Sequence, residues 1–154
     1  SAGDFFSEVE KIAIELPALP RLTPEEIKTR FSWVKNVERD TAVTESAHMK
    51  LGTVLQGNES SINGSEYEHR LGAGRYFGLQ HALYLVEHQD DPECAAFKDL
   101  LGKFYIDFPG IVLVVADGRR SFPCLDSDGG RWFLYFRWIS GGLYRVGRVA
   151  CLRK

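Results

Sequence analysis

Three glycine turns divide the C-terminal part of the chain into short segments of similar length. They lie at 117–118, 128–130 and 141–142, about 11–13 residues apart, which is a spacing typical of successive hairpins. Aspartate or glycine followed by glycine is frequent in β-hairpin turns, because glycine readily adopts the positive φ angles that tight turns need. Before them stands the apolar run 111–116, IVLVVA, which is typical of a strand covered on both faces. The pattern therefore predicts an antiparallel meander sheet.

The chain is predicted to place helices first and strands second. Up to about residue 102 the apolar residues recur at helical spacing, and beyond it they run continuously or alternate. The predicted helices cover 4–16, 23–35, 41–55, 75–89 and a short segment that opens at Pro92. The predicted strands cover 104–108, 111–116, 121–125, 131–139 and 143–151. This order indicates a single α+β domain over 1–154, with about four or five helices (about 4–102) packed on one face of an antiparallel meander of about three to five strands (about 104–152).

The clearest local signal is the start of the second predicted helix, TPEE at 23–26. Thr23 can accept a hydrogen bond from an N–H group of the first turn, and Pro24 has no N–H group to leave unpaired. The two glutamates that follow face the positive end of the helix dipole. We therefore expect this helix to begin at Pro24 and to bury Ile27.

Charge is distributed unevenly along a chain whose net charge is only −2. Residues 119–154 hold eight arginines and lysines against two aspartates, which gives this segment +6 and leaves −8 for the rest. Such a division indicates either an acidic partner or acidic and basic parts that pack together in one fold. The three cysteines are widely spaced, which is typical of a reducing compartment. No apolar run of 18 residues and no signal peptide is visible, so we expect a cytoplasmic location and no membrane partner.

The segment 131–151, RWFLYFRWISGGLYRVGRVAC, is predicted to form a hairpin that turns at 141–142. Side chains alternate between the faces of a strand, and opposed residues share a face. One face would be apolar and lie in the core: Trp132, Leu134, Phe136 and Trp138, opposite Gly147, Val149 and Cys151. The other face mixes arginine with aromatic rings and should be at least half exposed, because arginine is rarely buried without a partner. Its candidate binding residues are Arg131, Phe133, Tyr135, Arg137, Tyr144 and Arg148.

A face of this composition favours a non-enzymatic binding module. Tyrosine and arginine are frequent at protein-interface hot spots, and rings interleaved with arginine also suit stacked bases and phosphates. We expect an acidic protein surface or a second copy of the chain as partner, and nucleic acid as a further alternative. The chain lacks the strand motif and element order of the RRM fold, which counts against nucleic acid. The same face could also be idle, with guanidinium groups stacked on rings in solvent.

The alternative hypothesis is an enzyme or a small-ligand-binding protein. Its pocket would lie between the sheet and the predicted helix at 75–89. The residues that would line this pocket are Tyr76, His81, Tyr84, Trp132 and Trp138. A cavity with convergent polar groups would favour this hypothesis over the binding face.

The residue types that usually carry catalysis or bind metals form no recognisable set. Glu66 and His69 give a single Glu-x-x-His spacing, whereas a metal site in a helix bundle uses two such pairs. Cys124 has no base nearby in the sequence, which favours a buried structural cysteine over a nucleophile. We therefore expect no metal, no cofactor and no catalytic residue. The glycines of LGAGRYFG at 71–78 could admit an anion to the start of a helix beside Arg75.

Overall fold

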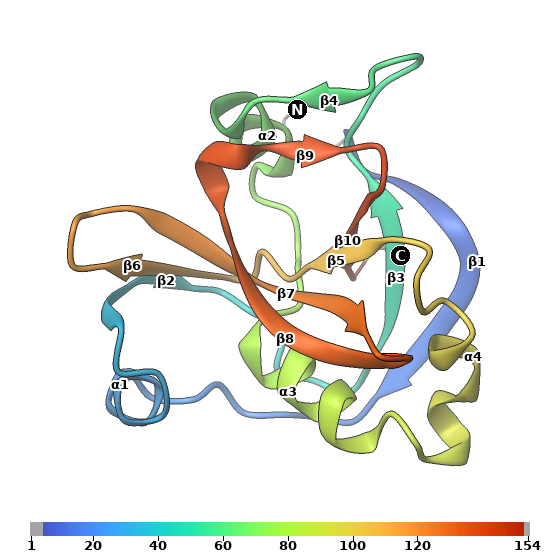
Figure 1. Cartoon of the computed structure of the whole chain (residues 1–154), viewed down its shortest axis with the longest axis horizontal. Coiled ribbons are helices and arrows are strands. Elements are labelled where there is room, and N and C mark those ends of the chain that lie inside the picture. The colour runs from blue at the N-terminus through green and yellow to red at the C-terminus, as the bar shows by residue number, and fades with distance from the viewer. Residues whose placement is uncertain (1–4, 153–154) are drawn as a thin grey trace.

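The computed structural model of the chain is dominated by one eight-stranded mixed sheet with short helices around it (Figure 1). It describes residues 5–152, apart from the surroundings of the Ala13 side chain. The strands are β1 (Ser7–Leu16), β2 (Val34–Asp40), β3 (Ala47–Thr53), β4 (Ser61–Ile62), β5 (Tyr105–Asp107), β6 (Ile111–Val115), β7 (Arg120–Asp128), β8 (Arg131–Trp138), β9 (Leu143–Tyr144) and β10 (Gly147–Cys151). The helices are α1 (Pro24–Arg30), α2 (Gly64–Leu71), α3 (Leu79–His88) and α4 (Ala95–Lys98), with 3-10 turns at Pro92–Cys94 and Ile139–Gly141.

Strand β7 is the branch point of the large sheet. The strand order is β1-β3-β10-β5-β7-β6-β2, and β8 pairs with the remaining edge of β7. Leu125 pairs with both β5 and β8, and Ser121 pairs with both β6 and β8, so β5 and β6 share one edge of β7. Strands β10 and β5 run parallel, whereas the other pairs in the sheet are antiparallel. The short strands β4 and β9 form a separate pair.

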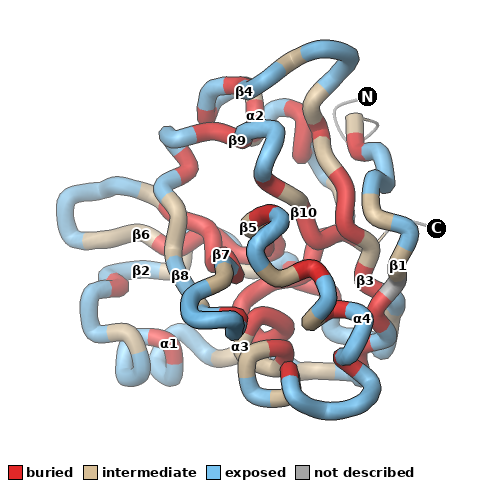
Figure 2. Tube along the Cα trace, turned by 45° about the vertical axis from the view of Figure 1, so that its right-hand side comes forward, coloured by how far each residue is buried: buried red, intermediate tan, exposed pale blue. Residues whose placement is uncertain are grey.

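Apolar side chains pack on both faces of this sheet. On the first face, helices α1, α3 and α4 cover residues such as Leu51, Leu113 and Trp132. On the second face, α2 and the β4–β9 pair cover residues such as Val112 and Phe122. The buried residues follow β3, β10, β5 and β7 through the middle of the molecule (Figure 2). Strand β6 contributes to both cores, which confirms the strand predicted at 111–116.

The predicted order of helices followed by a meander is wrong, because four strands lie in the part predicted to be helical. Residues 7–16 form β1 rather than a helix, and Asp4, its predicted cap, lies outside the described residues. Ile12, Ile14 and Leu16 face the core at a period of two. Val9, Ile12 and Leu16 also satisfy a helical period, but Val9 is exposed. A short amphipathic segment therefore fits both patterns, and pairing with β3 selects the strand.

The third predicted helix, 41–55, is also a strand, β3. Its buried residues Met49 and Leu51 alternate with half-buried Lys50, which is the strand period. The β-branched residues and Gly52 of this segment oppose a helix. A side chain at Gly52 would collide with the backbone of Ser7 in β1, so the glycine permits this close pairing.

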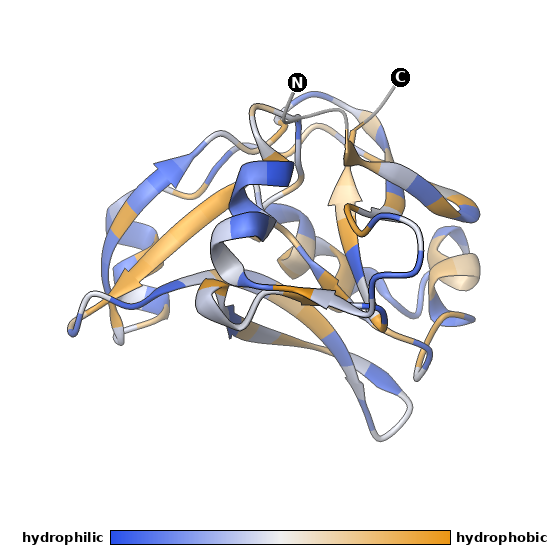
Figure 3. Cartoon of the chain, turned by 90° about the horizontal axis from the view of Figure 1, so that it is seen from above, coloured by the Kyte–Doolittle hydropathy of each residue, from blue (hydrophilic) through white to orange (hydrophobic). Residues whose placement is uncertain are grey.

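Other local predictions are confirmed. Helix α1 begins at Pro24 with a complete capping box, in which Thr23 Oγ1 accepts from the Glu26 N–H and the Glu26 carboxylate accepts from the Thr23 N–H. The helix ends at Arg30, earlier than predicted, because the chain then enters β2 and pairs with β6. Helix α3 starts later than predicted, at Leu79. In Figure 3, β6 is hydrophobic along its length and its partner β2 is largely hydrophilic, as expected for an edge strand.

The predicted hairpin between 131–139 and 143–151 does not form. Strand β8 pairs with β7, whereas β9 pairs with β4, and β10 pairs with β3 and β5. A 3-10 turn follows β8, and Gly142 at a φ of +71° then lies against the backbone of Ile62. That close approach, which only glycine allows, directs the chain to β4 instead of back along β8.

Candidate functional site

Strand β8 carries large side chains on both faces, and its pairing with β7 defines which of them share a face. Ser121 pairs with Trp138 and Ser127 pairs with Trp132, so both tryptophans lie on the first face of the sheet. Trp132 is 1 % exposed and stacks on Phe97, which confirms its predicted burial. Trp138 is 38 % exposed, and its predicted burial is wrong. The covering helices α3 and α4 lie over the other end of β8, so this end of the face stays open.

The open end of the first face is a groove of about 510 Å³. The residues that line it are mostly aromatic or apolar: Trp33, Val115, Arg119, Ser121, Leu134, Tyr135, Phe136 and Trp138. We call this surface the aromatic groove. Its volume lies within the range of about 300–1,000 Å³ that is typical of ligand pockets. Because apolar surface gains free energy on leaving water, the groove is suited to an apolar group.

The second wall of the groove comes from the turn that follows α1. The ring of Phe136 lies 5.2 Å from the ring of Phe31 and 4.5 Å from that of Trp33, both edge to face. Such aromatic pairs contribute about 0.5–1.5 kcal/mol beyond their buried area. They hold Trp33 beside β8 although its side chain is 40 % exposed. The early end of α1 is therefore what brings Trp33 to the groove.

A buried hydroxyl lies in the lining of the aromatic groove. Ser121 is 1 % exposed, and its Oγ has no hydrogen-bond partner among the described residues. A buried polar atom without a partner costs about 1–3 kcal/mol, so such atoms are rare in native proteins. The hydroxyl is shielded from solvent, so it lies beneath the groove surface. The groove thus has apolar walls above one buried, unpaired hydroxyl.

Basic residues stand close to the Trp33 wall along the chain. Lys28, Arg30 and Lys35 lie within five residues of Trp33 in the sequence. Within residues 5–152, none of these three forms an ion pair with a carboxylate. Arg119 lies 4.0 Å from the Trp138 ring and pairs with Asp117 at the surface. The segment that carries Trp33 therefore bears positive charge that no described carboxylate neutralises.

Three of the predicted binding residues, Arg131, Phe133 and Tyr135, lie on the other face of β8. Phe133 and Tyr135 are exposed, as predicted. Arg131 pairs with Asp90 at 3.1 Å, and this hydrogen bond lowers the pKa of Asp90 to about 2, with help from Lys98. Tyr135 also reaches the edge of the aromatic groove. This part of the predicted surface is present, but its arginine is already paired.

Arg137 lies on the same side of β8, but its guanidinium group is turned inward. Its Nε lies 2.8 Å from Oδ1 of Asp107, a carboxylate that is 0 % exposed. The Tyr67 hydroxyl donates to the same carboxylate at 2.8 Å, and the Tyr105 ring lies 4.2 Å from the guanidinium carbon. Burial, and then the negative charge of Asp107, raise the pKa of Tyr67. Burial alone would lower the pKa of Arg137, but the hydrogen bonds to Asp107 and the negative charge of Asp107 together outweigh it, and the pKa is raised.

The remaining two predicted residues lie elsewhere. Tyr144 is on β9, paired with Ser61 of β4. Arg148 is on β10, where its Nε lies 3.1 Å from Glu10 and its guanidinium carbon lies 4.8 Å from the Phe104 ring. The pairing that would have placed them opposite β8 is wrong. The six predicted residues therefore do not form one continuous face.

Ion pairs explain the uneven charge of the sequence. Arginines of the basic C-terminal segment pair with carboxylates from earlier in the chain. These pairs are Arg120 with Glu38 and Glu68, Arg131 with Asp90, Arg137 with Asp107, and Arg148 with Glu10. The two charged parts pack against each other within the fold, which is the second interpretation of the sequence pattern.

The five residues of the alternative pocket are not brought together. His81 and Trp132 are buried in the core. Tyr76 lines a pocket on the second face, and Trp138 lines the aromatic groove. Tyr84 stacks on His88 at 4.1 Å beside a third pocket. The three residues that reach a pocket thus reach three different ones.

The other candidate chemical groups have structural partners. Cys124 is buried, and burial followed by the charge of Asp107 raises the pKa of its thiol. Glu66 pairs with Arg70 at 2.7 Å, and the His69 ring lies 6.3 Å from the Phe5 ring. Within residues 5–152, no three His, Cys, Asp or Glu side chains lie in an arrangement that could hold a metal ion.

The sequence did not predict the aromatic groove or the Asp107 network. The predicted helix 23–35 includes Trp33, and a helix there gives no reason for its contact with Phe136. The predicted strand 104–108 includes Asp107, but its position between β10 and β7 depends on pairing with distant strands. In the sequence, the buried charge is indicated only by the aspartate that stands among the apolar residues of FYIDF at 104–108.

Comparison with known proteins gives no match: no family model, curated protein or solved structure is similar to this chain. In the described part of the chain, no helix has the length and apolar character needed to cross a membrane.

Proposed function

We propose that this protein is a binding module whose aromatic groove takes an apolar side chain from an acidic protein segment. The observation that carries the proposal is the open aromatic groove itself, with Trp33, Phe136 and Trp138 around one concave surface. Tryptophan is the residue most enriched at interface hot spots, and such residues act in pockets that exclude water. A partner side chain of moderate size would fill the groove.

The charge around the groove supports an acidic partner. Lys28, Arg30 and Lys35 have no carboxylate partner among the described residues, whereas most arginines of the C-terminal segment are paired. Unpaired cations at the edge of an apolar site speed association with acidic surfaces and disfavour basic ones. The occupant we propose is therefore a segment with one large apolar residue flanked by Asp or Glu.

Nucleic acid is less well supported than protein. Binding to phosphates requires free arginine or lysine beside the stacking rings. On the exposed face of β8, Arg131 and Arg137 are both held by aspartates. Breaking these pairs would offset the energy that phosphate contacts supply.

The proposal is tested by selecting peptides from a random displayed library on the immobilised protein. We expect enrichment of acidic peptides with a Trp, Phe, Tyr or Leu anchor, and affinity that falls as salt screens the charges. Trp33→Ala should weaken the binding of a selected peptide by at least about 2 kcal/mol, or about 30-fold in affinity. Tyr144→Ala, which removes an equally exposed ring on β9, is the matched control and should leave affinity unchanged.

Four outcomes would overturn the proposal. Enrichment of basic peptides would contradict the charge argument, and full affinity in Trp33→Ala would place the site elsewhere. Tight binding of single-stranded DNA or RNA at low salt, without peptide enrichment, would favour the nucleic-acid alternative. A dimer in light scattering that Trp33→Ala dissociates would identify a second copy of the chain as the occupant.

A further inference from the structure

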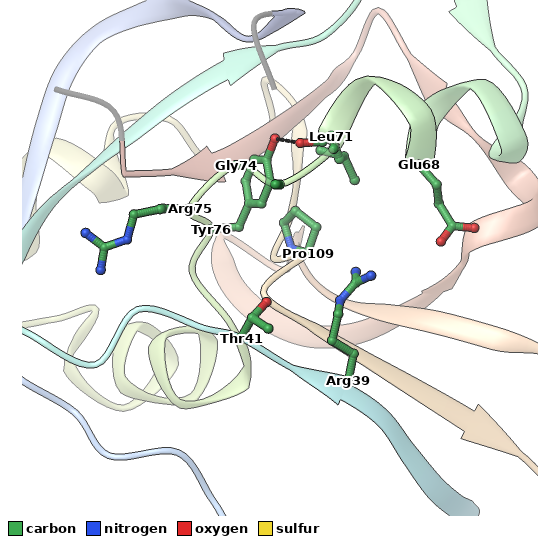
Figure 4. Close-up of a pocket in the computed structure, with 10 residues that line it drawn as sticks. Arg39, Thr41, Glu68, Leu71, Gly74, Arg75, Tyr76 and Pro109 are labelled. Atoms are coloured by element: carbon green, nitrogen blue, oxygen red, sulfur yellow. Dashed lines mark hydrogen bonds between the residues drawn. The ribbon is translucent and has the colours of Figure 1, made fainter. Parts of the chain in front are cut away.

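A second pocket, of about 390 Å³, opens on the second face of the sheet, away from the aromatic groove. Figure 4 shows its lining, which includes Arg39, Thr41, Glu68, Leu71, Tyr76 and Pro109, together with the loop 72–75. The loop is the glycine-rich segment noted in the sequence. The pocket therefore gives that segment a location next to β2 and the turn that follows β5.

A β-bulge turns Arg39 toward this pocket. Val37 pairs with Leu113 and Arg39 pairs with Val112, so two steps along β2 match one step along β6. Leu113 packs on the first face and Val112 on the second, and paired residues share a face. Without the bulge, Arg39 would lie on the same face as Val37. Bulges that redirect one side chain in this way are frequent beside functional sites.

Arg39 is a cation without a carboxylate partner. It forms no ion pair or side-chain hydrogen bond with another residue of 5–152. The two nearby carboxylates, Glu38 and Glu68, are both held by Arg120, at 2.6 Å each. In Figure 4 the Arg39 guanidinium and the Thr41 hydroxyl are directed toward the middle of the lining residues. Arg75 is directed away from them and pairs with Glu45 at 2.7 Å.

The backbone around the pocket is held by hydrogen bonds between distant segments. Thr41 N–H donates to the Gly110 carbonyl at 2.8 Å, and Gly110 N–H donates to the Phe77 carbonyl at 2.9 Å. In the loop 72–75, the N–H groups of Ala73 and Arg75 donate to no other described residue. Because this backbone is already held in place and has unused N–H donors, little conformational entropy is lost when an anion binds to it.

We propose that this pocket binds a small molecule through a phosphate group. The guanidinium group of Arg39 can donate hydrogen bonds to two phosphate oxygens at once. The Thr41 hydroxyl and the loop amides can donate to the third oxygen. A carboxylate has only two oxygens and would leave one of these donors unused. The faces of Pro109 and Tyr76 provide an apolar wall for the remainder of the molecule. Because Glu68 lines the far side, the phosphate sits on the Arg39 side. This site is independent of the aromatic groove.

The test uses phenyl phosphate and inorganic phosphate as probes, titrated into the full chain at low salt and followed by amide NMR shifts. We expect saturable shifts at residues 39–41 and 72–76, with phenyl phosphate binding more tightly than inorganic phosphate. Arg39→Ala should lower the affinity for phenyl phosphate at least about tenfold, because a charge-assisted hydrogen bond is lost. Arg39→Lys should weaken it less, because it keeps the charge but loses the fork.

Lys35→Ala is the matched control. It removes the same charge from the same strand, β2, outside the pocket lining, and Lys35 and Arg39 are both exposed, so neither change should unfold the chain. Affinity in Lys35→Ala should stay within about twofold of the wild type, whereas general electrostatic attraction would weaken both variants equally. Equal loss in the two variants, unsaturable shifts, or shifts outside these segments would each overturn the proposal. Thermal melting of both variants checks that the fold is intact.

Discussion

Two neighbouring regions of the sheet, around Asp107 on the second face and around Ser121 on the first, differ in how their buried polar atoms are bonded. On the second face, the Asp107 carboxylate is fully buried and accepts hydrogen bonds from both Arg137 and Tyr67. On the first face, Ser121 Oγ and His81 Nε2 are buried and have no hydrogen-bond partner among the described residues. Ser121 and Arg137 belong to neighbouring paired strands, β7 and β8. The contrast therefore arises over a distance of a few residues.

This difference separates a closed region from an open one. A complete polar network in a low-dielectric interior fixes side chains in one arrangement, but it leaves no donor or acceptor for a ligand. An unpaired buried hydroxyl costs stability and fixes no neighbouring side chain. The Asp107 network is thus expected to hold the fold, whereas the Ser121 side of β8 borders the aromatic groove, where peptide binding is expected. The predictions below test that division.

The largest effect is expected for Asp107→Asn. The change leaves the Arg137 guanidinium buried beside a neutral group, and breaking one partner of a buried pair costs about 3–5 kcal/mol. Urea unfolding measures the loss. Asp126→Asn removes an exposed carboxylate of β7 and should change stability by less than about 0.5 kcal/mol. A loss below about 1 kcal/mol in Asp107→Asn would mean that the network does not hold the closed face.

The two tryptophans of β8 separate the covered and open ends of the first face. Trp132 is 1 % exposed, and its indole N–H donates to the Phe97 carbonyl at 3.3 Å. Trp132→Ala should therefore cost about 3–5 kcal/mol. Trp138→Ala removes an exposed ring and should cost less than about 1 kcal/mol, while it weakens the peptide binding proposed for the groove. Equal costs in denaturant unfolding would show that both ends of the face are packed.

His81 gives the first face a dependence on pH. Burial lowers its pKa from 6.5 to about 4, so only the unfolded state binds a proton between these values. Stability is unaffected by His81 above pH 6.5, falls as the pH drops from 6.5 toward 4, and levels off below that. The free energy of unfolding falls by about 3 kcal/mol in total, at about 1.4 kcal/mol per pH unit. His81→Leu should remove this slope, whereas His48→Gln, at an exposed site, should retain it.

The carboxylates titrate in a separate range. Hydrogen bonds from Arg70 lower the pKa of Glu59 to about 2, so its contribution to stability is lost only as the pH falls from about 4.5 toward 2. A loss of stability between pH 6.5 and 5 that persists in His81→Leu would contradict the assignment to His81. Unfolding midpoints at half-unit steps of pH separate the two ranges.

Local features of this fold could be predicted where one residue type decides the conformation. The capping box at Thr23 and the glycine turns fixed the start of α1 and the bounds of β6, β7 and β8 to within a few residues. The face that holds both Trp132 and Trp138 also follows from alternation alone. Strand pairing could not be predicted, because β10 pairs with β3 and β5, which lie about 40 to 100 residues earlier.

The candidate sites depended on such long-range pairing. Trp33 reaches Phe136 only because α1 ends early and β2 pairs with β6. Arg39 reaches its pocket only through a one-residue bulge, which no period in the sequence reveals. The arginines looked exposed because their acidic partners lie up to 138 residues away in the chain. Composition therefore located the charged groups, but not which of them are neutralised.

The smallest expected effect tests the open face most directly. Ser121→Ala removes a buried hydroxyl without a partner and leaves only a small void, so the free protein should gain about 1 kcal/mol in urea unfolding. Ser127→Ala, on the same strand and face but half-exposed, should change stability by less than about 0.5 kcal/mol. The same Ser121→Ala change should leave the affinity of a groove-bound peptide unchanged, because the hydroxyl is shielded from the groove surface. A stability loss of about 1 kcal/mol or more would show that Ser121 is already paired in the folded protein. In that case the Asp107 and Ser121 regions would not differ in how their buried polar atoms are bonded.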